Sequence, residues 1–289
     1  MKALILLLAA CSAASALHAQ PPLTQPEALR RLYRDYNPEK STAQWECTAG
    51  QKKKGAQERW PCQPESTTVS VSVAMMAEVE ENGTEKVYLA ASAKPAESRF
   101  GYECHACAPA IGAAVFVAQE GNWALQSANA AIGFYGGWGS PPGIDFIEVG
   151  PQQHGFLLSI ADEGQGFSTS LKVLAVPIGR TVSTVWSMQD EEDDLGAYDP
   201  AGKLNPFVPH RSSAAFRFAA GGGPGGGANR NFYDIEVISR GDNRDNWGHA
   251  TKTQDWTEVY RFKDGQYRLL RHKDFIEVKE PAPKPGRQH

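Results

Sequence analysis

The sequence predicts a mainly β protein, in which antiparallel sheets form a sandwich, a barrel or a propeller-like array behind one N-terminal helix. From residue 67 onward apolar residues alternate with polar ones, which is the period of strands with one buried face. Short apolar runs then recur at intervals of about 8–20 residues between turn residues, as in sandwiches and barrels. No repeat of fixed period is present, so nothing requires a propeller.

The composition excludes several other classes of protein. The 289 residues are 41% hydrophobic and 10% aromatic, which is too apolar for a disordered chain. The 28 glycines and 19 prolines show no three-residue period, so the chain is not collagen-like. The heptads of a coiled coil are missing. The formal net charge is −4, whereas nucleic-acid binders are basic, so we expect no nucleic-acid partner.

Residues 1–19 have the layout of a secretory signal peptide. Lys2 is followed by an apolar run over residues 3–10 and then by small residues that end at Ala19. We expect cleavage after Ala19, with residues 14–16 as an alternative site, and a periplasmic or secreted mature protein. The run is shorter than the ~20 apolar residues that cross a bilayer, and no later segment qualifies, so we expect no integral membrane segment.

Cys11 leaves a second interpretation of this leader open. The Leu-Ala-Ala-Cys sequence at residues 8–11 has the form of a lipoprotein signal, in which Cys11 would carry a lipid anchor. Both interpretations imply export. They differ only in whether the mature protein is released or held at a membrane surface.

A helix and a polar loop are expected over residues 20–66. Thr24 and Glu27 are three residues apart and form a capping box, with Pro26 in the first turn. The aliphatic and tyrosine side chains that follow share one helical face, and Asn37-Pro38 should end the helix. The remainder of this segment is polar and should be a loop closed by a Cys47–Cys62 disulfide.

Four cysteines remain once Cys11 leaves with the leader or is acylated. An even number of cysteines in an exported protein indicates two disulfides. Pairing of neighbours closes the shortest loops, which predicts Cys47–Cys62 and Cys104–Cys107. Two other connectivities stay open.

Two hairpins and a series of strands are predicted after the loop. Residues 69–75 and 86–89 form the first hairpin around the turn Asn82-Gly83, and residues 259–262 and 266–269 form the last around Lys263-Asp264-Gly265. The strands between them are expected at residues 114–118, 123–128, 145–149, 156–160, 171–176, 182–187, 214–218 and 232–239.

A soft domain boundary is expected near residue 188. An acidic run at residues 190–194, expected in a loop, and a glycine run at residues 221–227 separate a β-rich core (67–188) from a β-rich C-terminal part (189–279). One continuous β domain fits equally well. Residues 280–289 are rich in proline and are predicted to be a disordered tail.

The most distinctive local motif is Cys-His-Ala-Cys-Ala-Pro at residues 104–109. Such a pair can be a structural disulfide, a redox disulfide, or part of a metal site that uses Cys104, His105 and Cys107. A redox pair is normally activated by the start of a helix, but here Pro109 leads into a predicted strand. A structural disulfide is therefore our main prediction, with no metal and no cofactor. Haem attachment is excluded because Ala108, and not histidine, follows Cys107.

The motif also carries a resemblance. Residues 104–116, Trp123, the Gly-Gly-Trp-Gly-Ser-Pro-Pro loop at 136–142 and Gly155-Phe156 are similar to a group of uncharacterised exported proteins of Gram-negative bacteria. The likeness covers roughly residues 100–170. It implies export, and because that group has no established activity it implies no catalytic residue.

The loop over residues 135–143 contains the candidate ligand-binding residues Tyr135 and Trp138. An aromatic side chain among glycines and prolines can form an exposed platform for sugars or extended peptides. The alternative is that Trp138 folds back and covers the end of the sheet. The sequence has no nucleophile elbow, zinc-protease motif or P-loop lysine, and its histidines are scattered.

These observations predict an exported, non-enzymatic protein that binds an unknown protein or a cell-envelope ligand through its loops. The first alternative is a thiol–disulfide or metal-handling protein that uses Cys104, His105 and Cys107. The second is an envelope hydrolase whose catalytic residues form no linear motif.

Overall fold

A computed structural model of the chain describes residues 21–45, 68–97, 102–194, 196, 211–219, 231–244 and 250–274. The elements are α1 (Gln25–Leu32), β1 (Thr42–Gln44), β2 (Thr68–Glu81), β3 (Thr84–Pro95), β4 (Ala110–Gln119), β5 (Asn122–Phe134), β6 (Gly143–Gly150), β7 (Gln153–Gly164), β8 (Phe167–Ile178), β9 (Thr181–Asp193), β10 (Arg211–Ala219), β11 (Asp234–Arg244), β12 (Ala250–Lys263) and β13 (Gln266–Asp274).

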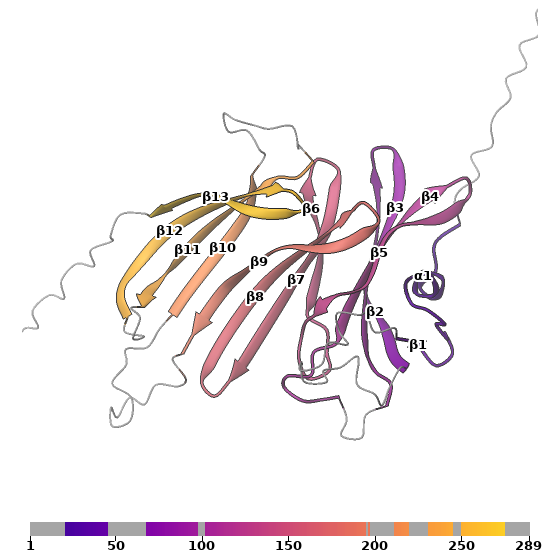
Figure 1. Ribbon diagram of the computed structural model, residues 1–289, viewed down its shortest axis with the longest axis horizontal. Coiled ribbons are helices and arrows are strands. Elements are labelled where there is room, and N and C mark those ends of the chain that lie inside the picture. The colour runs from indigo at the N-terminus through magenta and orange to yellow at the C-terminus, as the bar shows by residue number, and fades with distance from the viewer. Residues whose placement is uncertain are drawn as a thin grey trace, which may run out of the picture.

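The strands form two antiparallel sheets in which neighbours along the chain are neighbours in space. A five-stranded sheet has the order β1-β2-β3-β4-β5, and an eight-stranded sheet has the order β13-β12-β11-β10-β9-β8-β7-β6. Figure 1 shows the larger sheet curling into a half-barrel beside the smaller one, with α1 on the far side of the smaller sheet. The predicted class, antiparallel β sheets with one N-terminal helix, is confirmed.

Helix α1 begins as its sequence predicts and ends earlier than expected. The Thr24 hydroxyl accepts a hydrogen bond from the Glu27 amide at 3.4 Å, which caps the first turn. The helix stops at Leu32 because Tyr33 is already extended, and not at Asn37-Pro38. The Tyr33 ring is buried and its hydroxyl donates to the carbonyl of Ala130 at 3.5 Å, so packing on the smaller sheet ends the helix.

The predicted hairpins and strands all occur, and most are longer than expected. Asn82 and Gly83 both have positive φ angles, as do Asp264 and Gly265, which is the conformation of tight hairpin turns. The acidic run is the clearest correction. It was predicted as a loop, but β9 continues to Asp193.

The acidic end of β9 is held as a strand from both sides. Glu191 pairs with Ser170 of β8 and with Ser213 of β10. Lys172 and Arg211 lie 3.5 Å and 3.6 Å from the carboxylates of Asp190 and Glu191, which reduces the repulsion within the run. Strand β11 likewise continues to Arg244, beyond the predicted end of this strand at residue 239.

Three apolar clusters hold the layers together. The first packs α1 against one face of the smaller sheet, including β1. The second lies between the sheets, where Tyr88 and Ile111 of the smaller sheet meet Phe156 and Val173 of the larger one. The third fills the inside of the half-barrel around Trp186. The smaller sheet and strands β6–β9 therefore form a sandwich.

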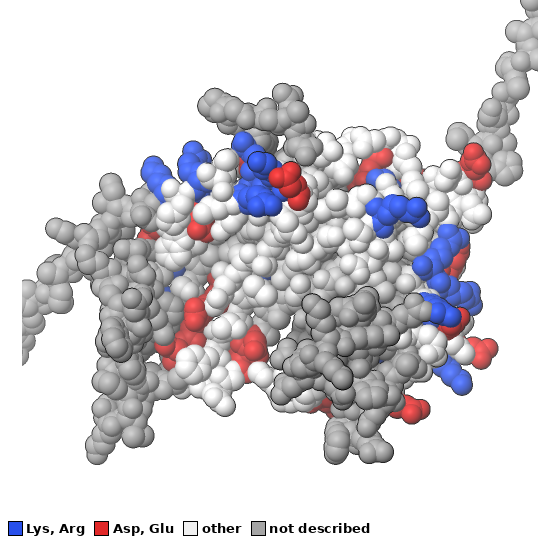
Figure 2. All heavy atoms as spheres, in the orientation of Figure 1, with Lys and Arg blue, Asp and Glu red and all other residues white. Residues whose placement is uncertain are grey.

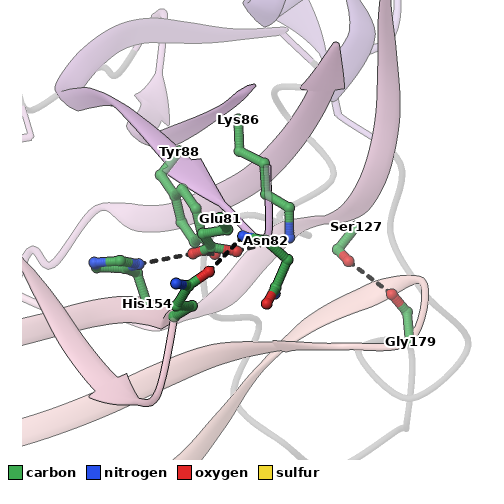
Figure 3. A network of polar contacts seen from close by, with 8 residues as sticks. Glu81, Asn82, Lys86, Tyr88, Ser127, His154 and Gly179 are labelled. Carbon is green, nitrogen blue, oxygen red and sulfur yellow. Dashed lines mark hydrogen bonds and ion pairs between the residues drawn. The ribbon is translucent and has the colours of Figure 1, made fainter. Parts of the chain in front are cut away.

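The sheets also meet directly at strand β5. The Ala128 amide donates to the carbonyl of Arg180 at 3.1 Å, and the Ser127 hydroxyl donates to the carbonyl of Gly179 at 2.7 Å (Figure 3). In Figure 2, acidic and basic side chains lie around the margins of the viewed face, and uncharged residues occupy its centre.

The larger sheet runs through the boundary that was expected near residue 188, since β9 pairs with both β8 and β10. The chain passes from one sheet to the other between β5 and β6, at residues 135–142.

Several predictions lie outside the described residues: the leader with Cys11, the Cys47–Cys62 disulfide, the glycine run and the tail. Among the described residues, no helix is long and apolar enough to cross a membrane.

Candidate functional site

The Cys-His-Ala-Cys motif forms a tight loop directly before strand β4. The Sγ atoms of Cys104 and Cys107 lie 1.99 Å apart, the distance of a disulfide bond, and the Cys107 amide donates to the carbonyl of Cys104 at 2.8 Å. The Tyr102 hydroxyl closes the loop by donating to the carbonyl of Ala108 at 2.7 Å. Burial raises the pKa of Tyr102 to about 12, so the hydroxyl remains a donor at neutral pH.

No helix follows the disulfide, because Pro109 leads straight into β4. The sulfurs therefore lack the helix N-terminus that stabilises a reactive thiolate. Cys104 is exposed and Cys107 is half-buried. The two sulfurs are bonded to each other, so in this state neither offers a thiolate to a metal. Within the described segments, no group of three or more His, Cys, Asp or Glu side chains is arranged to hold a metal ion.

The loop that carries Trp138 is docked on the cysteine loop through main-chain hydrogen bonds. The Trp138 amide donates to the carbonyl of Cys104 at 3.0 Å, and the Gly139 amide donates to the carbonyl of Cys107 at 2.8 Å. A Cβ atom at Gly139 would collide with the carbonyl oxygen of Tyr102. Glycine at this position therefore lets the two loops approach closely.

Trp138 itself is held in an unfavourable backbone conformation. Its φ angle is +54°, in the left-handed region that costs a non-glycine residue about 1–2 kcal/mol. The residue is 61% exposed, so this cost is not offset by burial in the core. Seven other non-glycine residues of the described segments share this left-handed conformation, and Trp138 differs from them in carrying a large exposed aromatic ring. The alternative that Trp138 folds back over the sheet is not what the structure shows.

His105 links the cysteine loop to the hairpin of β7 and β8. Its Nε2 atom lies 2.6 Å from Oδ1 of Asp162 and 3.0 Å from the carbonyl oxygen of Glu163. Because a carbonyl oxygen can only accept, Nε2 carries the hydrogen, and in the neutral ring Nδ1 is left as the acceptor. The ring centroid lies 5.5 Å from that of Trp138 in an edge-on arrangement.

The cysteine loop, the Trp138 loop and the β7–β8 hairpin line a pocket of about 530 Å³ that is open to solvent. Its lining residues are His105, Trp138, Asp162, Glu163, Gly164, Gln165, Phe167 and Thr169. Phe167 is 51% exposed. Asp162 is the cross-strand partner of Thr169, and Gly164 that of Phe167, so these residues share one face of the hairpin.

The structure brings two of the predicted candidates together and separates a third from them. His105 and Trp138 line the same pocket, although one was a candidate metal ligand and the other a candidate ligand-binding residue. Tyr135 is half-buried and packs on the cluster between the sheets, and its amide donates to the carbonyl of Pro109. Its ring therefore supports the loop from inside and is not among the residues that line the pocket.

A second polar cluster surrounds Glu81, whose side chain is completely buried (Figure 3). Oε1 accepts hydrogen bonds from the Tyr88 hydroxyl and from His154 Nδ1, both at 2.7 Å, and Oε2 accepts one from Lys86 at 2.7 Å. Phe146 stacks on the His154 ring with centroids 4.6 Å apart. The cluster ties the β2–β3 hairpin to β7, and sequence analysis did not identify it.

The cluster determines the charge states of its members. Burial alone would raise the pKa of Glu81, but hydrogen bonds from Lys86, Tyr88 and His154 outweigh it and hold the pKa below its ordinary value. Burial and the adjacent Glu81 carboxylate raise the pKa of Tyr88 well above its usual range. The carboxylate is thus ionised and the phenol protonated at neutral pH, which suits a structural connection between the sheets.

Compared with models of protein families, with curated proteins and with solved structures, the chain matches none. The pocket presents two exposed aromatic residues, the carboxylates of Asp162 and Glu163, the His105 imidazole, and the hydroxyl and amide groups of Thr169 and Gln165.

Proposed function

We propose that this protein is an exported, non-enzymatic binding protein whose ligand contacts Trp138 in the pocket beside the Cys104–Cys107 disulfide. The observation that carries the proposal is the exposed Trp138 side chain on a left-handed backbone. The fold accepts strain at this residue and gains no burial from it. A ligand that covers the ring supplies the missing contact.

The export part of the proposal is supported by the leader-like pattern over residues 1–19 and by the resemblance of residues 100–170 to exported proteins of Gram-negative bacteria. A disulfide in a small exposed loop is also typical of a protein that works in an oxidising compartment. The location would be the periplasm or the medium, where an unknown protein or a cell-envelope component is the partner.

Binding by the mature protein tests this function. Gram-negative cell envelopes are separated into glycan, peptide and lipid fractions, and each fraction is titrated into the protein in a calorimeter. We expect one fraction to bind, and binding to fall about tenfold in Trp138→Ala, which is the scale of one lost aromatic contact. Ile238→Ala removes an exposed apolar side chain from β11, outside the pocket lining, and is the matched control.

Two results would overturn the proposed function. The first is that no fraction binds the folded wild-type protein. The second is that Trp138→Ala and Ile238→Ala bind as tightly as the wild type, since the ligand would then contact another surface.

One observation favours a second function, that of a thiol–disulfide protein. Cys104 is exposed, and the adjacent His105 ring is held by Asp162 and Glu163. Measuring the reduction potential against glutathione separates the two functions. A pair that glutathione reduces readily would favour a redox role, whereas a pair that resists reduction would favour a structural disulfide under the binding site.

A further inference from the structure

We infer that the ligand class of this pocket is carbohydrate, and that a sugar ring lies against Trp138 and Phe167. The inference rests on the proposed binding function and adds the chemistry of the ligand. The two rings come from separate elements, the loop after β5 and the start of β8, and are 61% and 51% exposed. A flat ligand with apolar ring faces covers both at little cost in conformational entropy.

The polar groups of the pocket match hydroxyl groups better than a charged group. Asp162 and Thr169 are cross-strand partners on the pocket face, and Gln165 lies at the hairpin tip. Together they offer a carboxylate, a hydroxyl and an amide, a mixed set of donors and acceptors. A sugar hydroxyl can donate to one such group and accept from another.

The charge of the pocket disfavours an anionic ligand. Asp162 Oδ1 lies 2.6 Å from His105 Nε2 and accepts its hydrogen bond. An anionic ligand would meet the Asp162 and Glu163 carboxylates, and His105 is already engaged by Asp162 and by the Glu163 carbonyl. A neutral polyhydroxylated ligand meets no such repulsion and can donate to these carboxylates.

An extended peptide would find only a short and partly occupied strand edge here. Strand β6 begins at Gly143, which pairs with Ser159 of β7, so residues 161–164 of β7 extend past the start of β6 and have no β6 partner. The carbonyl oxygen of Glu163 on this edge already accepts a hydrogen bond from His105 at 3.0 Å. A peptide strand would have to break that bond before it could pair, whereas a sugar on the pocket face leaves it intact.

The size of the pocket agrees with this class. Its volume of about 530 Å³ lies within the range of about 300–1,000 Å³ that is usual for small-molecule sites. The pocket is open, so a longer glycan can extend beyond the sugar that contacts Trp138.

The test uses the mature protein and an array of neutral, N-acetylated and acidic oligosaccharides, together with the envelope glycan fraction. We expect neutral or N-acetylated sugars to bind. Trp138→Ala and Phe167→Ala should each weaken binding about tenfold, since each removes one stacking contact. Trp138→Phe should recover part of the affinity, and Ile238→Ala should not alter it. Far-ultraviolet circular dichroism and the melting temperature of each variant establish that it is folded.

Each outcome bears on a different claim. If the peptide or lipid fraction binds in a Trp138-dependent way and no saccharide binds, the carbohydrate class is wrong and the binding function stands. If only acidic sugars bind, the pocket carboxylates do not repel anionic ligands, and the preference for neutral sugars is wrong. If no fraction and no saccharide binds, both the class and the binding function are wrong.

Discussion

The main-chain amide of Trp138 donates to the main-chain carbonyl of Cys104, 3.0 Å away. This bond places the strained tryptophan directly on a loop that a disulfide closes. The exposed ring therefore projects from a fixed base, although it lies between two glycines. A binding residue on such a base loses little entropy when its ligand arrives.

Removing the disulfide should loosen this base while the fold remains. A bond that closes so short a loop contributes about 2 kcal/mol or less to the free energy of unfolding. We expect the Cys104→Ser/Cys107→Ser double variant to lose no more than this in urea denaturation. Amide exchange should rise at Trp138 and Gly139, whose hydrogen bonds end on this loop. Unchanged exchange at both amides would show that the disulfide does not hold the Trp138 loop.

Glycine should be better tolerated than alanine at position 138. Both substitutions remove the ring, but only glycine adopts a φ angle of +54° without steric cost. We expect Trp138→Gly to unfold with a free energy about 1 kcal/mol higher than Trp138→Ala, measured side by side in urea. Equal stabilities would mean that the backbone is not strained at this residue. Neither variant should bind ligand as the wild type does.

The buried carboxylate of Glu81 should be required for stability. Glu81→Gln removes the charge that Lys86 and His154 face and replaces an acceptor oxygen by an N–H group beside their donors. We expect a loss of about 3 kcal/mol, the scale for breaking a buried ion pair from one side. Glu85→Gln on the same hairpin is the matched control, because Glu85 is exposed and should cost little. If Glu81→Gln lost no more unfolding free energy than Glu85→Gln, the buried carboxylate would not be required for stability.

The same carboxylate should make stability fall in acid. The pKa of Glu81 is lower in the folded protein than its ordinary value of 4.5, so the unfolded chain binds a proton more readily. The stabilisation is therefore complete above pH 4.5 and is lost as the pH falls through the folded-state pKa. We expect the difference in unfolding free energy between wild type and Glu81→Gln to narrow between neutral pH and about pH 3. A constant difference would show that Glu81 does not titrate in this range.

Local patterns in the sequence were sufficient to predict most of the secondary structure. Alternation of apolar residues and the turn pairs Asn82-Gly83 and Asp264-Gly265 depend on neighbours along the chain, so the strands could be predicted. The end of α1 and the acidic end of β9 could not. Tyr33 leaves the helix to pack on a sheet formed much later in the chain, and Glu191 is held by pairing on both sides.

The candidate site was predictable only in part, for the same physical reason. The cysteine motif and the glycine-flanked Trp138 are local signals, and both lie at the pocket. Asp162 and Phe167 gave no signal, because they reach His105 and Trp138 only when the β7–β8 hairpin folds against the cysteine loop. Glu81 and His154 are likewise 73 residues apart in sequence and meet between sheets. An isolated glutamate at the end of a predicted strand looks like a solvated residue.

The most direct test of the binding site is a titration of the ¹⁵N-labelled mature protein, followed by nuclear magnetic resonance at the indole N–H of Trp138. This resonance is assigned by its disappearance in Trp138→Phe. As the envelope glycan fraction is added, we predict a saturable shift of this resonance, while those of the buried Trp123 and Trp186 stay in place. A protein that binds the glycans with the Trp138 resonance unmoved, or with shifts confined to the other tryptophans, would contradict the account.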